Sequence, residues 1–234
     1  MATQPDIDLH SEEEAFRTEV QQFLAENFPE ELKGKGNALS AIEGPDEENE
    51  AERAWREAMG ERGWGVPTWP KEYGGGGLHS DYQRAATRAM KKYDAPIMIN
   101  ANGNGWAGPL ILDLGTEEQK QKYIKPMLSA EDIWCQGFSE PENGSDLGNA
   151  QLKAVKDGDE YVLNGSKIWT SLGDRAKYMI LLARTDFDAP NKYAGLSFFL
   201  NPMDIDGITT SRIKKLTGEY GFVQTFFTDR KSVV

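Results

Sequence analysis

Small hydroxyl residues, turn residues and one indole are concentrated between Ile133 and Ser171. The segment opens as IWCQGFSEPENGSDLG and closes as NGSKIWTS, and two stretches of alternating polar and apolar residues lie between these blocks. Backbone and hydroxyl groups can hydrogen-bond the edge of a flat heteroaromatic ligand, and tight Gly and Asn turns bring the backbone close to it. The indole of Trp169 can cover an edge or a face of such a ring. These residues therefore predict a site for a planar heteroaromatic ligand.

Other chemistries suggested by single residues are not supported by their context. Gly144-Ser145-Asp146 lacks the G-x-S-x-G spacing of a nucleophile elbow, and no histidine is near it in the sequence. The glycine run 74–77 is not part of a GxxxxGK[ST] motif, so it does not indicate a phosphate loop. Cys135 stands beside large apolar residues and is expected to be a buried small residue. With one cysteine and two histidines in the chain, no metal-ligand cluster is expected.

The run WCQGFSEPENGSD, followed by DGDEYVLNGSKIWTS, resembles the flavin-binding middle-domain signature of the acyl-CoA dehydrogenase family. The first block is specific because hydroxyl-Glu-Pro-x-x-Gly-Ser-Asp is long, and the second block follows at the spacing of the family. The resemblance covers nearly the whole chain, from SEEEAFRTEV through PTWPKEYGG and LGTEEQKQKYIKPMLS to LTGEYGFVQTFFTD. A segment similar to PTWPKEYGG joins early helices in relatives, so we expect a structural crossing at the glycine run.

The resemblance implies FAD-dependent α,β-dehydrogenation of an acyl-CoA thioester. In that reaction a proton leaves Cα, a hydride leaves Cβ, and FAD accepts the hydride because no side chain can. The resemblance also implies an electron-transferring flavoprotein as the electron acceptor and a homo-oligomer, either a dimer or a tetramer. The alternatives are an acyl-CoA oxidase or flavin monooxygenase of the same fold, or an inactive flavin-binding fragment.

Six residues match flavin-contacting positions of the family: Gln136, Phe138, Ser139, Trp169, Thr170 and Ser171. The first three match positions that contact the isoalloxazine ring through backbone and hydroxyl groups. Trp169 matches an indole beside the ring, and Ser171 matches a hydroxyl residue that hydrogen-bonds near flavin N5. Thr170 fills a neighbouring position that is usually aliphatic.

Gly144 and Ser145 match a turn and a serine close to the CoA moiety of the substrate. The chain departs from the family here, because Glu142-Asn143 replaces the Gly-Ala or Gly-Gly pair that often precedes Gly-Ser. The catalytic base of relatives is a glutamate on a C-terminal helical domain, and we expect it beyond Val234. The chain as given is therefore expected to be inactive on acyl-CoA esters.

Composition narrows the classes of partner. The net charge of −12 argues against nucleic acid, and an anionic CoA ester would need a local basic patch. No apolar run approaches the roughly 18 residues of a membrane span. The N-terminus is acidic and polar, unlike a signal peptide, so a cytoplasmic protein is expected.

Hydrophobic periodicity changes from about 3.6 to 2 after Ser129. Helices are expected at 9–27, 46–62, 80–92 and 116–128, with Ser11 and Thr116 as N-caps of the first and the last. Two short helices interrupted by Asn and Gly are expected within 95–114, where the small residues 103–108 could shape room for a substrate or allow close helix packing. Strands are expected at 151–155, 161–163, 178–183, 196–200, 209–213 and 224–228, with turns at Asp157-Gly158 and Asn164-Gly165.

These elements predict an α+β multidomain protein, in which an N-terminal all-α domain is followed by an antiparallel β-barrel or sandwich. We expect the domains at 1–131 and 132–229. The final string Asp-Arg-Lys-Ser-Val-Val is the translation of the start of a widely used sequencing adapter. Residues 230–234 are therefore predicted to be a non-native tail.

Overall fold

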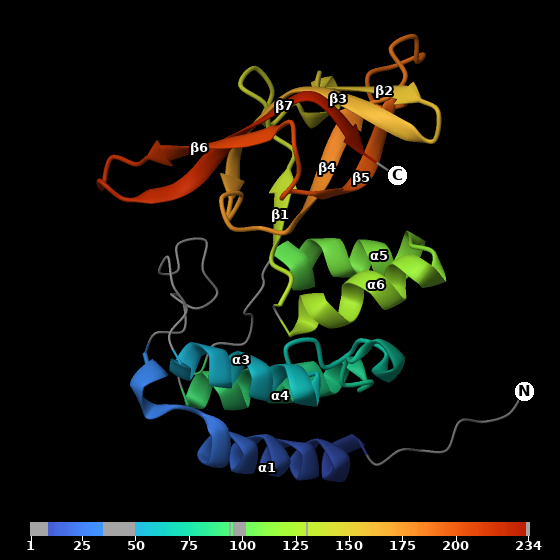
Figure 1. The fold of residues 1–234 in the computed structure, drawn as a ribbon. Helices are drawn as coiled ribbons and strands as arrows, with labels where there is room; N and C mark the ends of the chain where they lie inside the picture. The colour runs from blue at the N-terminus through green and yellow to red at the C-terminus, as the bar shows by residue number, and fades with distance from the viewer. Residues whose placement is uncertain (1–8, 35–49, 94, 96–101, 130, 233–234) are drawn as a thin grey trace, which may run out of the picture. The chain divides into compact units, whose positions relative to one another are not determined.

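The computed structural model describes residues 9–34, 50–93, 95, 102–129 and 131–232 (Figure 1). The chain forms two compact units, Met1–Asn104 with Leu114–Ala130, and Gly105–Asp113 with Glu131–Val234. The first unit is helical and the second is built on a curled mixed sheet, which is the α+β class that the sequence predicts. The units differ from the expected division at 131/132 in residues 105–113 and in Glu131, which group with the strands.

The helical unit contains α1 (Leu9–Asn27), η1 (Glu30–Leu32), α3 (Glu50–Arg62), η2 (Lys71–Tyr73), α4 (Ser80–Lys92) and α6 (Glu117–Leu128). The helices α1 and α4 have the predicted bounds, but Ser11 is not the N-cap of α1, because the helix begins at Leu9. The predicted first turn of α3 lies outside the described residues. Thr116 is the N-cap of α6, as expected. Its hydroxyl accepts a hydrogen bond from Gln119 N (3.2 Å), and Gln119 Oε1 accepts one from Thr116 N (2.9 Å), which completes a capping box.

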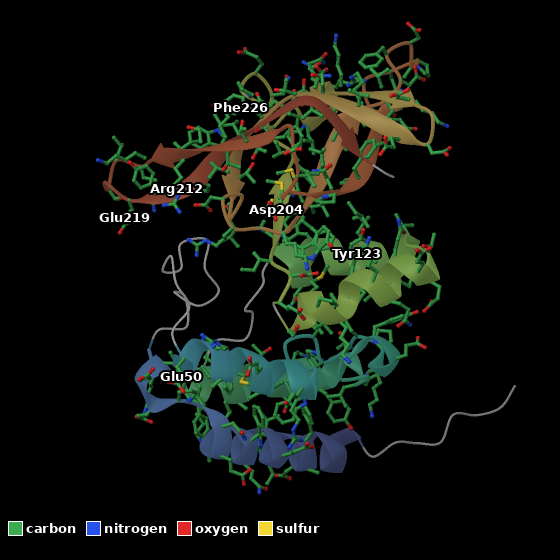
Figure 2. All side chains as sticks on the ribbon, in the orientation of Figure 1. Glu50, Tyr123, Asp204, Arg212, Glu219 and Phe226 are labelled. Carbon is green, nitrogen blue, oxygen red and sulfur yellow. The ribbon has the colours of Figure 1, made fainter. Side chains whose placement is uncertain are left out.

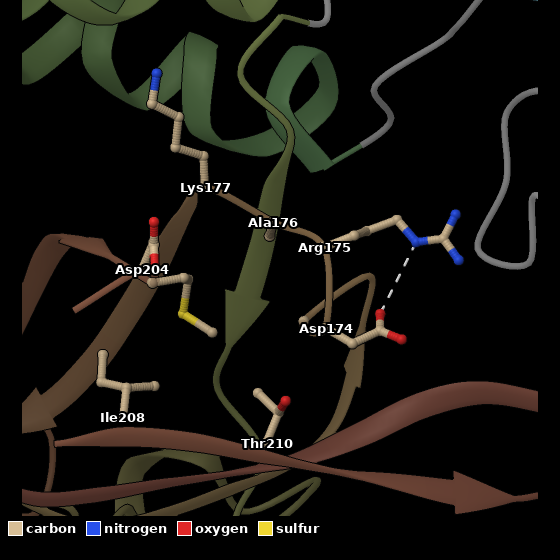
Figure 3. A pocket seen from close by; sticks show the side chains of 9 residues that line it. Asp174, Arg175, Ala176, Lys177, Asp204, Ile208 and Thr210 are labelled. Carbon is tan, nitrogen blue, oxygen red and sulfur yellow. Dashed lines mark ion pairs between the residues drawn. The ribbon is translucent and has the colours of Figure 1, made fainter. Parts of the chain in front are cut away.

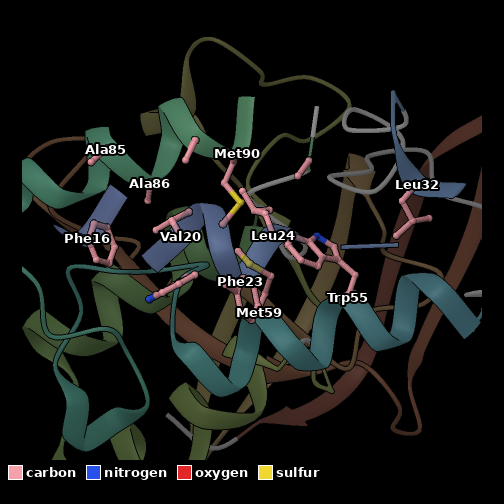
Figure 4. Packing of buried hydrophobic residues seen from close by; sticks show 13 residues of the cluster. Phe16, Val20, Phe23, Leu24, Leu32, Trp55, Met59, Ala85, Ala86 and Met90 are labelled. Carbon is pink, nitrogen blue, oxygen red and sulfur yellow. The ribbon is translucent and has the colours of Figure 1, made fainter. Parts of the chain in front are cut away.

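The core of the helical unit is aromatic (Figure 4). The apolar stripe of α1 brings Phe16 and Phe23 against Trp64, with ring centroids 5.7 and 4.7 Å apart in edge-to-face geometry. Trp55 of α3 is fully buried against the same cluster. The partner that the stripe of α1 requires is therefore provided by α3, α4 and the segment that follows α3.

The glycine run 74–77 is a site of close backbone packing. A Cβ atom on Gly75 would lie 2.4 Å from the carbonyl oxygen of Trp69, and one on Gly76 would lie 2.5 Å from that of Pro67. The hydroxyl of Tyr73 donates to Glu117 Oε2 at 2.7 Å, which fastens this segment to α6. This geometry supports the structural crossing expected from the sequence.

Between the predicted helices 80–92 and 116–128, the expected interrupted helix takes an unusual form. Residues 103–107 form a π-helical turn, η3 (Gly103–Ala107), which continues directly into α5 (Gly108–Leu114). Residues 96–101 of the predicted pair of helices lie outside the described residues. The choice between substrate space and close packing for 103–108 stays open.

The sheet comprises β1 (Trp134–Gly137), β2 (Lys153–Asp157), β3 (Glu160–Ser171), β4 (Tyr178–Arg184), β5 (Leu196–Pro202), β6 (Ile208–Lys214) and β7 (Tyr220–Ser232). Its strand order is β1-β4-β2-β3-β7-β6, and β5 pairs with β4 on the side path. The inner face buries Leu163, Met179, Leu181, Phe199 and Phe227 as one cluster. The sheet thus curls around its own core as a half-barrel. A short η4 (Leu147–Asn149) precedes β2.

Two expectations about the sheet are wrong. It is not wholly antiparallel, because β1 pairs with β4 in parallel and β2 meets β4 in parallel at Lys153 and Arg184. The strand β1 was not expected because its buried run does not alternate. Asn164-Gly165 is a β-bulge inside β3 and not a turn, since the β3 to β7 register shifts there. Gly165 has φ +142°, and its backbone lies against Leu152.

Strands β6 and β7 form a long hairpin that extends from the sheet, and Figure 2 shows Arg212, Glu219 and Phe226 along it. The pairing of β3 with β7 continues past the predicted domain end at residue 229, because residues 161–163 of β3 pair with residues 230–232. The assignment of 230–234 as a non-native tail stays a prediction.

The glycine crossing gives a test of packing. Gly75→Ala should lower the free energy of unfolding by about 1–3 kcal/mol, because the new methyl group would overlap the Trp69 backbone. Gly105→Ala is the control, since its Cβ would meet no atom within 4 Å. Urea unfolding followed by circular dichroism measures both. Equal stabilities of the two variants would contradict the packing described.

Candidate functional site

The two sequence blocks that predict a heteroaromatic site lie side by side. The amide of Ile168 on β3 donates to the carbonyl oxygen of Ser139 at 2.9 Å. Gln136 lies on β1, and Phe138 and Ser139 follow it, so they meet the end of β3 that carries Trp169 and Ser171. Phe138 also packs edge-to-face against Phe198 of β5, with centroids 5.5 Å apart.

Trp169 is held in a conformation that bulky residues rarely adopt. Its φ is +61°, and it lies within a shift of the β3 to β7 register between Lys167 and Thr170. Such backbone strain costs of order 1–3 kcal/mol and is typical of functional positions. The indole is 56% exposed and meets Phe222 edge-to-face with centroids 6.1 Å apart. The bulge therefore presents an aromatic ring that the described chain leaves largely uncovered.

Ser171 and Thr170 lie on opposite faces of the sheet. Ser171 pairs with Phe222, the ring that contacts Trp169, whereas Thr170 pairs with the buried Val223. Directly paired residues project to the same side of a sheet, so Ser171 shares the Trp169 face and Thr170 points to the interior. Thr170 is 1% exposed, and in the part of the chain that the structure describes its hydroxyl lacks a hydrogen-bond partner. Of the two residues, Ser171 can offer its hydroxyl to a ligand at the indole, whereas Thr170 can offer only backbone.

A buried ion pair lies beneath this junction. Lys167 Nζ donates to Glu140 Oε1 at 2.8 Å and to the carbonyl oxygen of Phe138 at 3.0 Å. Glu140 also accepts hydrogen bonds from the amides of Gln151 (2.7 Å) and Leu152 (2.8 Å). The Lys167 side chain is fully buried and that of Glu140 is 6% exposed. The pair thus ties the segment after β1, the approach to β2, and β3 together.

Both partners have shifted pKa values. Burial alone would raise the pKa of Glu140, but the hydrogen bonds from Lys167 and from the two backbone amides lower it below its ordinary value. Burial lowers the pKa of Lys167, and Glu140 opposes that shift. Glu140 is therefore a weakly basic carboxylate held in place, and not a free general base.

Sequence reasoning did not identify this pair, although a signal was present. In β3 the side chains of residues 163 and 167 are both fully buried, and the one at 167 is a lysine. An inward lysine in a small sheet requires a buried acceptor. Glu140, between a serine and a proline of the recognised block, was read only as part of the signature.

The residues matched to the CoA moiety lie on a braced turn. Glu140 and Asn143 exchange two backbone hydrogen bonds of 2.8 and 3.0 Å, and Asn143 is buried with its Oδ1 accepting from Asn149 Nδ2 at 3.0 Å. Gly144 and Ser145 follow in exposed positions. The departure from the family at 142–143 therefore has a structural role, because Asn143 anchors the turn that presents Gly144 and Ser145.

A second feature on the sheet is a cavity of about 400 Å³ (Figure 3). It is lined by residues 173–177 with Met203, Asp204, Ile208 and Thr210, and it contains none of the residues matched to the flavin. Asp174 on its wall forms ion pairs with Arg212 (2.7 Å) and Arg175 (3.9 Å). The carboxylate of Asp174 is already neutralised, so the cavity does not present an unpaired charge at this residue.

The remaining alternatives from the sequence can be compared with the described residues. Cys135 is fully buried, and burial raises the pKa of its thiol, so it is not a poised nucleophile. Among the described residues, no group of three or more His, Cys, Asp or Glu side chains could hold a metal ion. Within the same residues, none of the helices has the length and apolar character needed to cross a membrane.

The chain thus has a helical unit and a curled mixed half-barrel, and Trp169 lies on a bulge of β3 in the half-barrel. Residues 10–131 match the acyl-CoA dehydrogenase N-terminal domain, and residues 135–229 match the acyl-CoA dehydrogenase middle domain. The chain belongs to the acyl-CoA dehydrogenase family.

Individual relatives agree with this assignment. The chain is 36% identical over 222 residues to acyl-CoA dehydrogenase IpdE1 of Mycobacterium tuberculosis, covering 94% of this chain and 56% of the relative. It is 37% identical over 172 residues to the mitochondrial short-chain specific acyl-CoA dehydrogenase of Bos taurus, covering 71% and 40%. A solved Tcur3481-Tcur3483 steroid ACAD variant aligns with TM-score 0.78 and 30% identity, covering 96% and 57%. The chain spans about half the length of the curated relatives it matches.

The Glu140 pair predicts acid-sensitive stability. The folded state holds the pKa of Glu140 below its unfolded value of 4.5, so its contribution is present above that value and is lost as pH falls through the lower folded pKa. Glu140→Gln should lose about 3–5 kcal/mol at neutral pH, because Lys167 is left buried without its counter-charge. It should also flatten the dependence of unfolding free energy on pH below 4.5.

Urea unfolding across a pH series measures both effects. Glu142→Gln, an exposed neighbour in the same turn, is the matched control and should behave as the parent. A Glu140→Gln variant with the parent's pH slope would show that this carboxylate is not the linked group.

Proposed function

We propose that this chain forms the helical and flavin-binding parts of an FAD-dependent acyl-CoA dehydrogenase, which converts an acyl-CoA thioester to the 2-enoyl-CoA. The observation that carries the proposal is the junction of Ser139 with Ile168, next to the exposed and strained Trp169. The hydrogen bond there brings together two separate sequence blocks that both match flavin-contacting positions of the family.

The residues at the junction fit an isoalloxazine ring. The exposed indole of Trp169 offers a flat apolar surface. Ser139 precedes Trp169 in the sequence and Ser171 follows it, and both are half-buried residues with a hydroxyl group. Such a set suits a ring that is apolar on its faces and carries donors and acceptors on its edge. When bound, FAD supplies the hydride acceptor that side chains lack.

We assign binding and orientation of the ligands to this chain. Trp169 would pack against the flavin ring, Ser139 and Ser171 would orient its edge, and Gly144 with Ser145 would approach the CoA moiety from the braced turn. Proton removal from Cα is not assigned to Glu140, because its carboxylate is bonded to Lys167 and to two backbone amides. Among the described residues, we assign none as the base that removes this proton.

The acyl group and the partners are parts of the same proposal. Electrons from reduced FAD are proposed to pass to an electron-transferring flavoprotein. The relatives are described as short-chain specific and as steroid enzymes, so the acyl-CoA panel for a test should contain both classes. A homo-oligomer is proposed as the assembly. Light scattering on the purified protein distinguishes a homo-oligomer from an assembly that needs a second, different chain.

The proposal predicts the phenotype of two site variants. Trp169→Ala and Ser171→Ala should each weaken FAD retention or slow the reduction of FAD by acyl-CoA. The first removes ring packing, and the second removes an edge hydrogen bond with a cost of about 0.5–1.5 kcal/mol. Flavin content after gel filtration and anaerobic bleaching rates measure both.

Phe187→Ala and Ser211→Ala are the matched controls, since both residues are exposed and neither belongs to the junction. Normal flavin content and parental reduction rates in Trp169→Ala and Ser171→Ala would sink the residue assignment. Rapid reoxidation of the reduced enzyme by air would favour the oxidase alternative over transfer to a flavoprotein.

A further inference from the structure

We propose that Lys167, together with Glu140, is a positioning residue that sets the register between the two flavin-contacting segments. The inference rests on the proposed flavin site and assigns the pair a role in building it. Lys167 and Glu140 do not themselves touch the ligand face, because both side chains are buried inside the half-barrel.

The first argument is connectivity. The Lys167 ammonium group reaches across from β3 to the backbone of Phe138 and to the side chain of Glu140. One residue later along β3, the amide of Ile168 bonds to the carbonyl of Ser139, the residue between those two acceptors. Three consecutive residues after β1 are thus held by two consecutive residues of β3. Sliding either segment by one residue would break all of these bonds.

The second argument is location relative to the bulge. The register of β3 against β7 shifts between Lys167 and Thr170, so β7 does not fix the backbone of the intervening Trp169. The backbone of β3 must therefore be held by residues other than those of β7. The hydrogen bonds from Lys167 and Ile168 to residues 138–140 hold it where the regular pairing with β7 ends. The strained φ of Trp169 persists only when its surroundings over-determine it.

The third argument is cost. A buried ion pair adds little net stability compared with apolar residues of the same shape. An apolar side chain at 167 would avoid the desolvation of two charges. A lysine retained at this position is therefore better explained by the directional bonds it makes than by packing.

The experiment uses Lys167→Arg, which keeps a cation, the double variant Lys167→Met/Glu140→Gln, which leaves no unpaired buried charge, and Arg184→Met as control. Arg184 is also buried, and it bonds to the carbonyl oxygens of Gly148, Ala150 and Lys192 without touching residues 138–140. It therefore matches the burial of a cation but not its position.

The first arm needs no cofactor. Hydrogen exchange of the Ile168 amide, relative to amides of β4 and β5, should speed up at least about tenfold in the double variant, equivalent to about 1.4 kcal/mol of local opening. Lys167→Arg should restore most of the protection, and Arg184→Met should leave the ratio at the parental value. Parental protection in the double variant would overturn the proposal.

The second arm adds FAD to the same proteins and follows its visible circular dichroism, a signature of ring orientation that general destabilisation does not change in the bound state. The double variant should bind FAD about tenfold more weakly and with an altered spectrum, whereas Arg184→Met should keep the parental spectrum. An unaltered spectrum in the double variant would overturn the positioning role.

Two further outcomes are decisive. If the parent binds no FAD, the proposed function fails, and the exchange arm still decides whether Lys167 sets the register. If Lys167→Arg and the double variant both fail to fold while Arg184→Met folds, the pair is a determinant of the whole half-barrel, and its specific role at the junction is refuted.

Discussion

Removing a lysine from water is costly, and this half-barrel can hold one in its interior only because a carboxylate and a carbonyl oxygen meet it there. Lys167 obtains both acceptors from a single segment, and Glu140 completes its own requirements with two backbone amides at the approach to β2. The consequence is that three stretches far apart in sequence can close only in one register. The contact between the two sequence blocks, the braced turn at Asn143 and the exposed position of Trp169 all depend on this register.

The two units are stabilised by different kinds of interaction. The helical unit relies on apolar area, with Trp55 and Trp64 at its centre, and on glycines that let one backbone run against another at Trp69. The sheet unit depends more on buried charged side chains that donate hydrogen bonds to backbone carbonyl groups. Arg184, like Lys167, is such a side chain, and it donates to the carbonyl oxygens of Gly148, Ala150 and Lys192. A ligand site that needs fixed edge groups is more readily built on the second kind of scaffold, because directional bonds specify angle as well as distance.

The sequence predicted those parts of the fold whose determinants are local. The bounds of α1 and α4 follow from periodicity, and the start of α6 follows from Thr116 and Gln119. Non-local features were missed. The strand β1 does not alternate because three of its four residues are buried, and the bulge at Asn164-Gly165 lies where the backbone of Leu152, just before β2, approaches Gly165. At the candidate site, the residue types point to Trp169 and Ser171, whose role in ligand binding stays a prediction. The inward direction of Thr170 depends on a register shift, and Lys167 finds its partner Glu140 on another segment of the chain, so the local sequence around either residue does not predict these features.

The left-handed backbone at Trp169 has a consequence for any effort to make this protein more robust. Leu172, three residues on, shares the same positive φ, so two bulky residues in one short stretch hold conformations that glycine or asparagine would adopt at lower cost. A screen that selects for thermal stability alone would favour small residues at positions 169 and 172. The stabilised variants would then lack the exposed indole. At these positions higher thermal stability would therefore come at the expense of ligand contact, so stabilising substitutions should be sought elsewhere in the chain.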